Sequence, residues 1–189
     1  MKKFWIIALT LVATFRFGFS QEIKLSERAQ VSIITFGPVS VEQDFVGASS
    51  FAAPRLKASG STPMGEAINL ALDKIEERKQ IYKQSGISYY RPWIFLVTDG
   101  MPDRGDPWAT AVQRVRDAEA KKKIAFFAVG VKGADMDVLG QLSSREPLSL
   151  QGLKFSEMFT WLSGSLSSVS RSRPGDDVPL QSPASWGTV

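Results

Sequence analysis

Three short, unbroken apolar runs are the feature of this chain that most restricts its fold. They read VSIITF, WIFLVT and IAFFAVGV, and they occupy Val31–Phe36, Trp93–Thr98 and Ile124–Val131. Runs of this length, rich in β-branched and aromatic side chains, are typical of strands that are buried on both faces. Such strands occur in sheets that helices cover on both sides, so the runs predict helices between them.

The segments that follow the first two runs have the periodicity of amphipathic helices. Thr62-Pro63 precedes one segment and Asp106-Pro107 precedes the other. A hydroxyl or carboxylate followed by proline is typical of a helix start, so Thr62 and Asp106 are predicted to be N-caps. The apolar positions recur at steps of three and four, at Met64, Ala67, Ile68, Ala71, Leu72 and Ile75 in the first segment and at Trp108, Ala111, Val112, Val115 and Ala118 in the second.

The remaining chain adds weaker elements. Val39–Val46 is predicted to be a strand near a sheet edge, and Gly47–Gly60 a surface loop. A short helix is predicted over Asp135–Leu142 and a Ser-rich helix over Phe155–Val169. Residues 171–189 have no periodicity and are predicted to be a C-terminal tail.

Strands that alternate with helices at this spacing predict right-handed crossovers and parallel pairing. The expected fold is therefore α/β, a three-layer sandwich around a mostly parallel, Rossmann-like sheet. We expect it to form one domain over residues 21–170.

Residues 1–20 form an apolar segment with more than one interpretation. A basic start, an apolar run over Phe4–Phe15 and small residues at Gly18 and Ser20 are typical of a secretory signal peptide. Trp5–Ala13 also fits a strand buried on both faces, and a misplaced translation start is a third interpretation. The run is shorter than the roughly 20 apolar residues of a bilayer-spanning helix, so no stable membrane span is predicted.

Composition excludes several kinds of chemistry. The chain contains no Cys and no His, which excludes disulfides, thiolate or imidazole metal sites and histidine-dependent catalytic triads. Its 23 basic and 19 acidic residues leave a formal charge of only +4, which does not support nucleic-acid binding. Any metal must therefore be bound by oxygen atoms.

Two oxygen-bearing side chains are predicted at one edge of the sheet. Asp99 follows the WIFLVT run, and Thr62 lies in the loop before the first helix. Ligands of open α/β sheets bind outside the carboxyl ends of the strands, and a carboxylate with a hydroxyl suits Mg²⁺. Asp99 before Gly100 also fits a turn, and the Thr62 hydroxyl also fits a helix cap, so structural roles stay open for both.

The motifs GSTPMG at Gly60–Gly65 and VTDG at Val97–Gly100, in this order of strands and helices, resemble the von Willebrand factor type A domain. The likeness is closest to bacterial stand-alone type A proteins related to tellurium-resistance accessory proteins. It extends from about Val31 to the C-terminus and includes the stretches YYRPW, FFAVG and LSSVS, at residues 89–93, 126–130 and 166–170.

The resemblance implies a metal-ion-dependent adhesion site. In that family a D-x-S-x-S loop after the first strand, a threonine and an aspartate hold Mg²⁺ or Mn²⁺. Thr62 matches the threonine and Asp99 matches the aspartate, but no D-x-S-x-S sequence occurs in this chain. The resemblance therefore implies an incomplete site, which either binds Mg²⁺ or Mn²⁺ weakly or binds no metal.

An apolar run stands where the family's first strand and its ligand loop belong, so the first strand is atypical. A parallel sheet needs a strand between VSIITF and WIFLVT, because an empty slot would leave two unpaired edges. We hypothesise that Trp5–Ala13 takes this slot and that Phe15–Arg28 is a short crossover to the next strand.

The function that the resemblance implies is protein binding through Ser61, Thr62, Asp99 and Gly100, with an acidic side chain of the partner completing the ion's coordination. The resemblance also implies a role in a bacterial stress or metal-resistance system and a location in the cytoplasm. Residues 1–20 resemble a signal peptide, so export stays open as an alternative location. A shortened or decayed copy without metal-dependent binding is the second interpretation. A metal-dependent hydrolase that uses Asp99 ranks last, since no general base or nucleophile accompanies it.

Other candidate sites have simpler explanations. Gly60 and Gly65 have the spacing of a phosphate loop, but no Lys follows them to neutralise a phosphate. Asp103 and Asp106 are interpreted as turn and cap residues. The remaining candidates are interpreted as a solvated helix end, at Lys121–Lys123, and as core or partner surface, at Trp108 and Trp161.

Overall fold

The computed structural model describes residues 5–13, 29–52, 54, 60–152 and 154–188. A single sheet runs through the molecule in the strand order β3-β2-β1-β5-β6-β7-β8, and β4 pairs with the end of β1. The strands are β1 Trp5–Ala13, β2 Ala29–Thr35, β3 Ser40–Gly47, β4 Ser88–Tyr89, β5 Trp93–Thr98, β6 Ala125–Gly130, β7 Leu148–Leu150 and β8 Gly187–Thr188. The helices are the 3₁₀ turn η1 Ala48–Ser50, α2 Met64–Gln84, α3 Trp108–Ala120, α4 Met136–Gly140 and α5 Phe155–Ser170.

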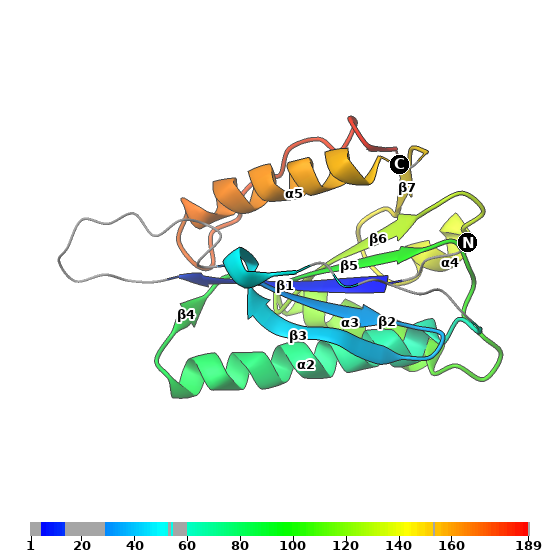
Figure 1. Ribbon diagram of the computed structural model, residues 1–189, viewed down its shortest axis with the longest axis horizontal. Coiled ribbons are helices and arrows are strands. Elements are labelled where there is room, and N and C mark those ends of the chain that lie inside the picture. The colour runs from blue at the N-terminus through cyan, green and yellow to red at the C-terminus, as the bar shows by residue number, and fades with distance from the viewer. Residues whose placement is uncertain (1–4, 14–28, 53, 55–59, 153, 189) are drawn as a thin grey trace.

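The expected three-layer α/β fold is confirmed. Helices α2 and α3 cover one face of the sheet, and α5 covers the other (Figure 1). Strands β5, β6 and β7 pair in parallel, and β2 runs in the same direction because both β2 and β5 are antiparallel to β1. The short strands β4, β7 and β8 are additions that the sequence did not predict.

Among the helices of the described ranges, none has both the length and the apolar character that crossing a bilayer requires.

Helix α2 buries the face that its periodicity predicts. The apolar side chains at three- and four-residue steps pack onto the sheet, while Asp73, Glu76 and Glu77 on the opposite face are exposed. Burial of this stripe and of the facing strand residues supplies the hydrophobic free energy that holds the layer in place. The fully buried members of this core include Met64, Ala67, Ile68, Ala71, Ile94, Leu96, Ala111, Val115 and Phe126.

The second face of the sheet is packed by aromatic rings. Phe95 and Phe127, on adjacent strands, stack with their centroids 4.6 Å apart. Trp161 of α5 meets both rings edge-on, at 6.4 and 6.1 Å. Trp161 therefore belongs to the core, one of the two roles expected for it.

The C-terminal segment packs against this aromatic core. Trp186 is fully buried and lies edge-on to Trp161, and the Trp161 indole N–H donates to the Gln181 carbonyl at 2.8 Å. Strand β8 then pairs with β7. The sequence predicts only a tail here because the anchoring residues, Leu180 and Trp186, follow neither helical nor strand periodicity.

Strand β1 occupies the slot between β2 and β5, as hypothesised for Trp5–Ala13. Ile6 lies opposite Ile34 on one side and opposite Leu96 on the other. All three side chains are fully buried in the core beneath α2 and α3. The N-terminal run therefore supplies the middle of the sheet in this structure.

The crossover hypothesised for Phe15–Arg28 implies that β1 runs parallel to β2, and this expectation is wrong. β1 runs antiparallel to both of its neighbours, whereas a crossover connection joins parallel strands. The segment expected to be that crossover, residues 15–28, lies outside the described residues. An apolar run that is buried on both faces has the same pattern in either direction, so direction was not readable from it.

Candidate functional site

The two loops that carry Thr62 and Asp99 meet at the carboxyl end of β5. Asp99-Gly100 directly follows β5, and Thr62 lies two residues before α2. A Cβ atom placed on Gly100 would lie 3.3 Å from Thr62 Cγ2 and 3.4 Å from Thr62 Oγ1. The absence of a side chain at Gly100 thus lets the Thr62 hydroxyl approach the residue next to Asp99. Ser61 is exposed at the same rim.

Asp103 holds Thr62 in this position. The Thr62 N–H donates to the Asp103 carboxylate at 2.6 Å, and the Asp103 N–H donates to the Thr62 carbonyl at 3.1 Å. The same carbonyl accepts the Met64 N–H at 2.8 Å. The sequence did not predict this clamp, because its two halves are 41 residues apart.

Asp106 caps helix α2 from the neighbouring loop. Its carboxylate accepts the Gly65 N–H at 2.6 Å and the Glu66 N–H at 3.0 Å. These are N–H groups of the first turn, which have no partner inside the helix. The carboxylate also lies at the positive end of the helix dipole, where negative charge is stabilising.

The two N-caps predicted from the sequence are therefore wrong. Pro63 and Pro107 are the N-cap residues of α2 and α3, and neither helix has a side-chain hydrogen bond from its own cap. The reason is the close approach of the two helix starts: a Cβ atom on Gly65 would lie 2.7 Å from the Trp108 backbone nitrogen. At this separation the Asp106 carboxylate reaches across to α2, and the Thr62 hydroxyl is not needed as its cap.

Asp99 has an unsatisfied oxygen. Its Oδ1 atom is buried and has no hydrogen-bond partner within the described residues. A buried carboxylate oxygen without a donor is costly, so a cation or a donor from outside the chain would stabilise it. Asp99 is thus the carboxylate at this rim whose buried oxygen has no donor within the described residues.

The oxygens at the rim suit a hard cation but form a small set. Both Asp106 oxygens and the Asp103 Oδ2 atom accept backbone N–H groups, and the residues predicted as metal ligands contribute the Thr62 hydroxyl and the Asp99 carboxylate. In the part of the chain that the structure describes, acidic residues form no group of three or more that could hold a metal ion. A magnesium site with two protein ligands depends on water and on a partner for the rest of its coordination.

The antiparallel direction of β1 places its carboxyl end away from this rim. Trp5, at the amino end of β1, lies opposite Val97 near the carboxyl end of β5. Ala13, at the carboxyl end of β1, pairs with Ser88 at the opposite edge of the sheet. A loop that follows β1 therefore starts at the far edge, whereas the family's D-x-S-x-S loop follows a strand that ends at the metal.

Comparison with known proteins identifies the family. A family model described as the von Willebrand factor type A domain matches residues 19–156, from a point after β1 to the start of α5. Searches of curated proteins and of solved structures gave no significant match. The matched region contains β2 to β7, helices α2 to α4 and both loops of the rim, and it covers well over half of the 189 residues. The chain therefore belongs to the von Willebrand factor type A domain family.

Proposed function

We propose that this chain is a protein-binding module whose contact surface is the rim formed by Ser61, Thr62, Asp99 and Gly100. Domains of this family generally mediate protein interactions, and these residues lie where open α/β sheets place their ligand sites. The similarity to the tellurium-resistance subgroup is the ground for assigning the module to a bacterial stress or metal-resistance system.

The observation that carries the proposal is the buried Oδ1 atom of Asp99, which no donor of the described residues satisfies. Thr62 and Asp99 would hold Mg²⁺ or Mn²⁺ through a hydroxyl and a carboxylate, which are ligands that these ions accept. The bound cation would supply positive charge at the rim. An acidic partner side chain requires that charge, because Asp99 alone would repel a second carboxylate.

The cation is held weakly in this proposal. Affinity for a hard cation rises with the number and charge of its ligands, and this rim offers one carboxylate and one hydroxyl. We therefore expect a dissociation constant of roughly a millimolar, with the partner's carboxylate increasing the apparent affinity because it adds a ligand.

Calorimetric titration tests the proposal. Mg²⁺ and then Mn²⁺ are titrated into the wild-type chain, into Asp99→Ala and into Asp117→Ala. Asp117→Ala removes the same charge from the far end of α3, where Asp117 is exposed. We expect binding to the wild type and to Asp117→Ala, and none to Asp99→Ala.

Absence of metal binding to the wild type would contradict the cation's role and favour a copy without metal-dependent binding. Equal binding to all three chains would place the cation elsewhere. Both results leave the family assignment unchanged, because that assignment depends on the sequence match.

A further inference from the structure

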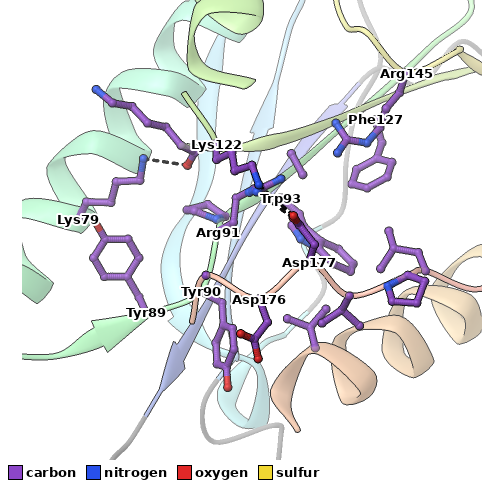
Figure 2. Close-up of a pocket in the computed structure, with 18 residues that line it drawn as sticks. Lys79, Tyr89, Tyr90, Arg91, Trp93, Lys122, Phe127, Arg145, Asp176 and Asp177 are labelled. Atoms are coloured by element: carbon purple, nitrogen blue, oxygen red, sulfur yellow. Dashed lines mark hydrogen bonds and ion pairs between the residues drawn. The ribbon is translucent and has the colours of Figure 1, made fainter. Parts of the chain in front are cut away.

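A cavity of about 660 Å³ lies at the edge of the sheet opposite Asp99 (Figure 2). It opens at the amino ends of β5 and β6, where Trp93 and Ala125 begin their strands. Strand β5 has six residues, so the cavity and the rim are separated by about 20 Å at a rise of about 3.3 Å per residue. The two places are distinct sites.

Five lysine and arginine residues line the cavity, and two of them already have partners elsewhere in the fold. The Lys79 ammonium, which is buried, donates to the Lys123 carbonyl at 3.1 Å and lies 3.7 Å from Glu76. The Arg145 guanidinium lies over the Phe127 ring at 5.4 Å and pairs with Glu119. The three that remain are Arg91, Lys122 and Lys123, and the backbone carbonyl of Lys123 is the acceptor for Lys79.

Arg91 and Lys122 face a carboxylate of the chain's own C-terminal segment. Lys122 Nζ lies 2.9 Å from Asp177 Oδ2, and Arg91 Nη2 lies 3.7 Å from Asp177 Oδ1. Figure 2 shows Asp177 in contact with the Lys122 side chain, with Arg91 beside them. The adjacent Asp176 carboxylate accepts the Arg173 N–H at 2.8 Å, so it closes a local turn instead.

The ion pairs of Asp177 with Arg91 and Lys122 can break and re-form readily. The side chains of Asp177 and Lys122 are 72% and 64% exposed, and exposed ion pairs contribute little to stability. The same segment continues as Val178-Pro179-Leu180, which also lines the cavity, and Leu180 packs against the aromatic core. One wall of the cavity is thus an acidic peptide stretch followed by apolar residues.

We propose that this cavity is a second binding site, which accepts an acidic linear peptide of a protein partner, and that residues 175–180, which form one of its walls, compete in cis for its cations through Asp177. Arg91 and Lys122 would bind the peptide's carboxylate, and the wall around Pro92 and Trp93 would contact the apolar residues that follow it. The site is independent of the rim at Asp99 and requires no metal.

Peptide binding to the full chain tests this proposal. The probe is a fluorescein-labelled peptide with the sequence of residues 173–182, RPGDDVPLQS, and the readout is fluorescence anisotropy. Asp177→Asn removes the competing carboxylate of the chain, so this variant should bind the probe about fivefold to tenfold more tightly than the wild type, because a larger fraction of sites is open. Asp137→Asn makes the same change at an exposed position of α4 and should leave binding unchanged.

A second variant identifies the cation that is responsible. Adding Lys122→Gln to Asp177→Asn should reverse the gain, and raising the salt concentration should weaken binding in every chain. Binding of Asp177→Asn no tighter than that of the wild type would overturn the proposal. So would equal binding of a control peptide with both aspartates replaced by asparagine, or complete displacement of the peptide by an equal concentration of inorganic phosphate.

Discussion

Thr62 and Asp103 exchange two hydrogen bonds that join the loop before α2 to the loop after β5. The Thr62 N–H donates to the Asp103 carboxylate at 2.6 Å, and the Asp103 N–H returns a bond to the Thr62 carbonyl at 3.1 Å. The position of Thr62 beside Gly100 therefore depends on an acid that lies 41 residues further along the chain.

Replacing Asp103 tests this clamp. Asp103→Ala leaves the half-buried Thr62 N–H without its charged acceptor, so the free energy of unfolding should fall by about 1–3 kcal/mol. The measurement is urea denaturation followed by circular dichroism. Asp117→Ala, at an exposed position of α3, should change stability by less than about 0.5 kcal/mol. An equally small effect of Asp103→Ala would show that the bond contributes nothing.

Gly65 should tolerate no side chain. A Cβ atom there would lie 2.7 Å from two backbone atoms at the start of α3, so Gly65→Ala forces the two helix starts apart and should cost about 1–3 kcal/mol. Gly164→Ala is the matched control within α5, where the nearest atom to a new Cβ is 3.6 Å away. It should stabilise the protein by about 0.5–1 kcal/mol, because Ala favours a helix over Gly. The same sign for both variants in thermal unfolding would contradict the close approach.

Truncation of Ile6 tests the central strand. Ile6 is fully buried between Ile34 and Leu96, so Ile6→Ala should lower the free energy of unfolding by about 2–5 kcal/mol. Ile81→Ala, at a position 48% exposed, should have a much smaller effect. Hydrogen exchange provides a second measurement, in which the amides of β1 should be protected as well as those of β5. Complete exchange of β1 in the folded protein would remove the strand from the sheet.

Lys79 should give stability a distinctive pH dependence. Burial lowers the pKa of its ammonium below the usual 10.5, against the opposing charge of Glu76 and with repulsion from Lys123 and Lys83. The unfolded chain therefore binds more protons between the two pKa values, and stability rises as pH increases through that interval. Lys79→Met should flatten this rise in urea denaturations between pH 7 and 10.5.

Lys74 is the control for this measurement because its pKa moves the other way. A hydrogen bond from Lys74 to Asp44 raises the pKa of the Lys74 ammonium above 10.5. Its contribution is fully present below pH 10.5 and is lost as pH rises through the higher folded-state pKa. Lys74→Met should therefore leave the rise below pH 10.5 in place. An identical pH profile for both variants would exclude Lys79 as its cause.

Local patterns predicted the elements of this fold well. The apolar runs became β2, β5 and β6, and the stripe of α2 is buried as its spacing requires. These features follow from the periodicity of buried side chains, which depends on nearby residues alone. The capping of α2 by Asp106 was missed because sequence rules look for a cap beside the helix, and this one lies 40 residues away.

The same limit applies to the two sites. The rule that ligands bind at the carboxyl ends of strands selected Thr62 and Asp99, and the structure places their loops together. The sequence predicts only a solvated helix end at Lys122, because the contact of Lys122 with Asp177 spans 55 residues of chain. No local pattern contains a charge pair of that separation.

The sequence by itself determined the long central strands and the amphipathic helices, the apolar faces that they bury, and that a metal could be bound only by oxygen atoms, because each follows from residue types and short spacings. Only the tertiary structure decided that β1 runs against its neighbours, that Asp103 and Asp106 support loops other than their own, and that the C-terminal segment lies across a basic cavity. Pairing direction and long-range contacts depend on which surfaces meet in space, and an apolar run or an isolated charge has the same local pattern whichever partner it finds.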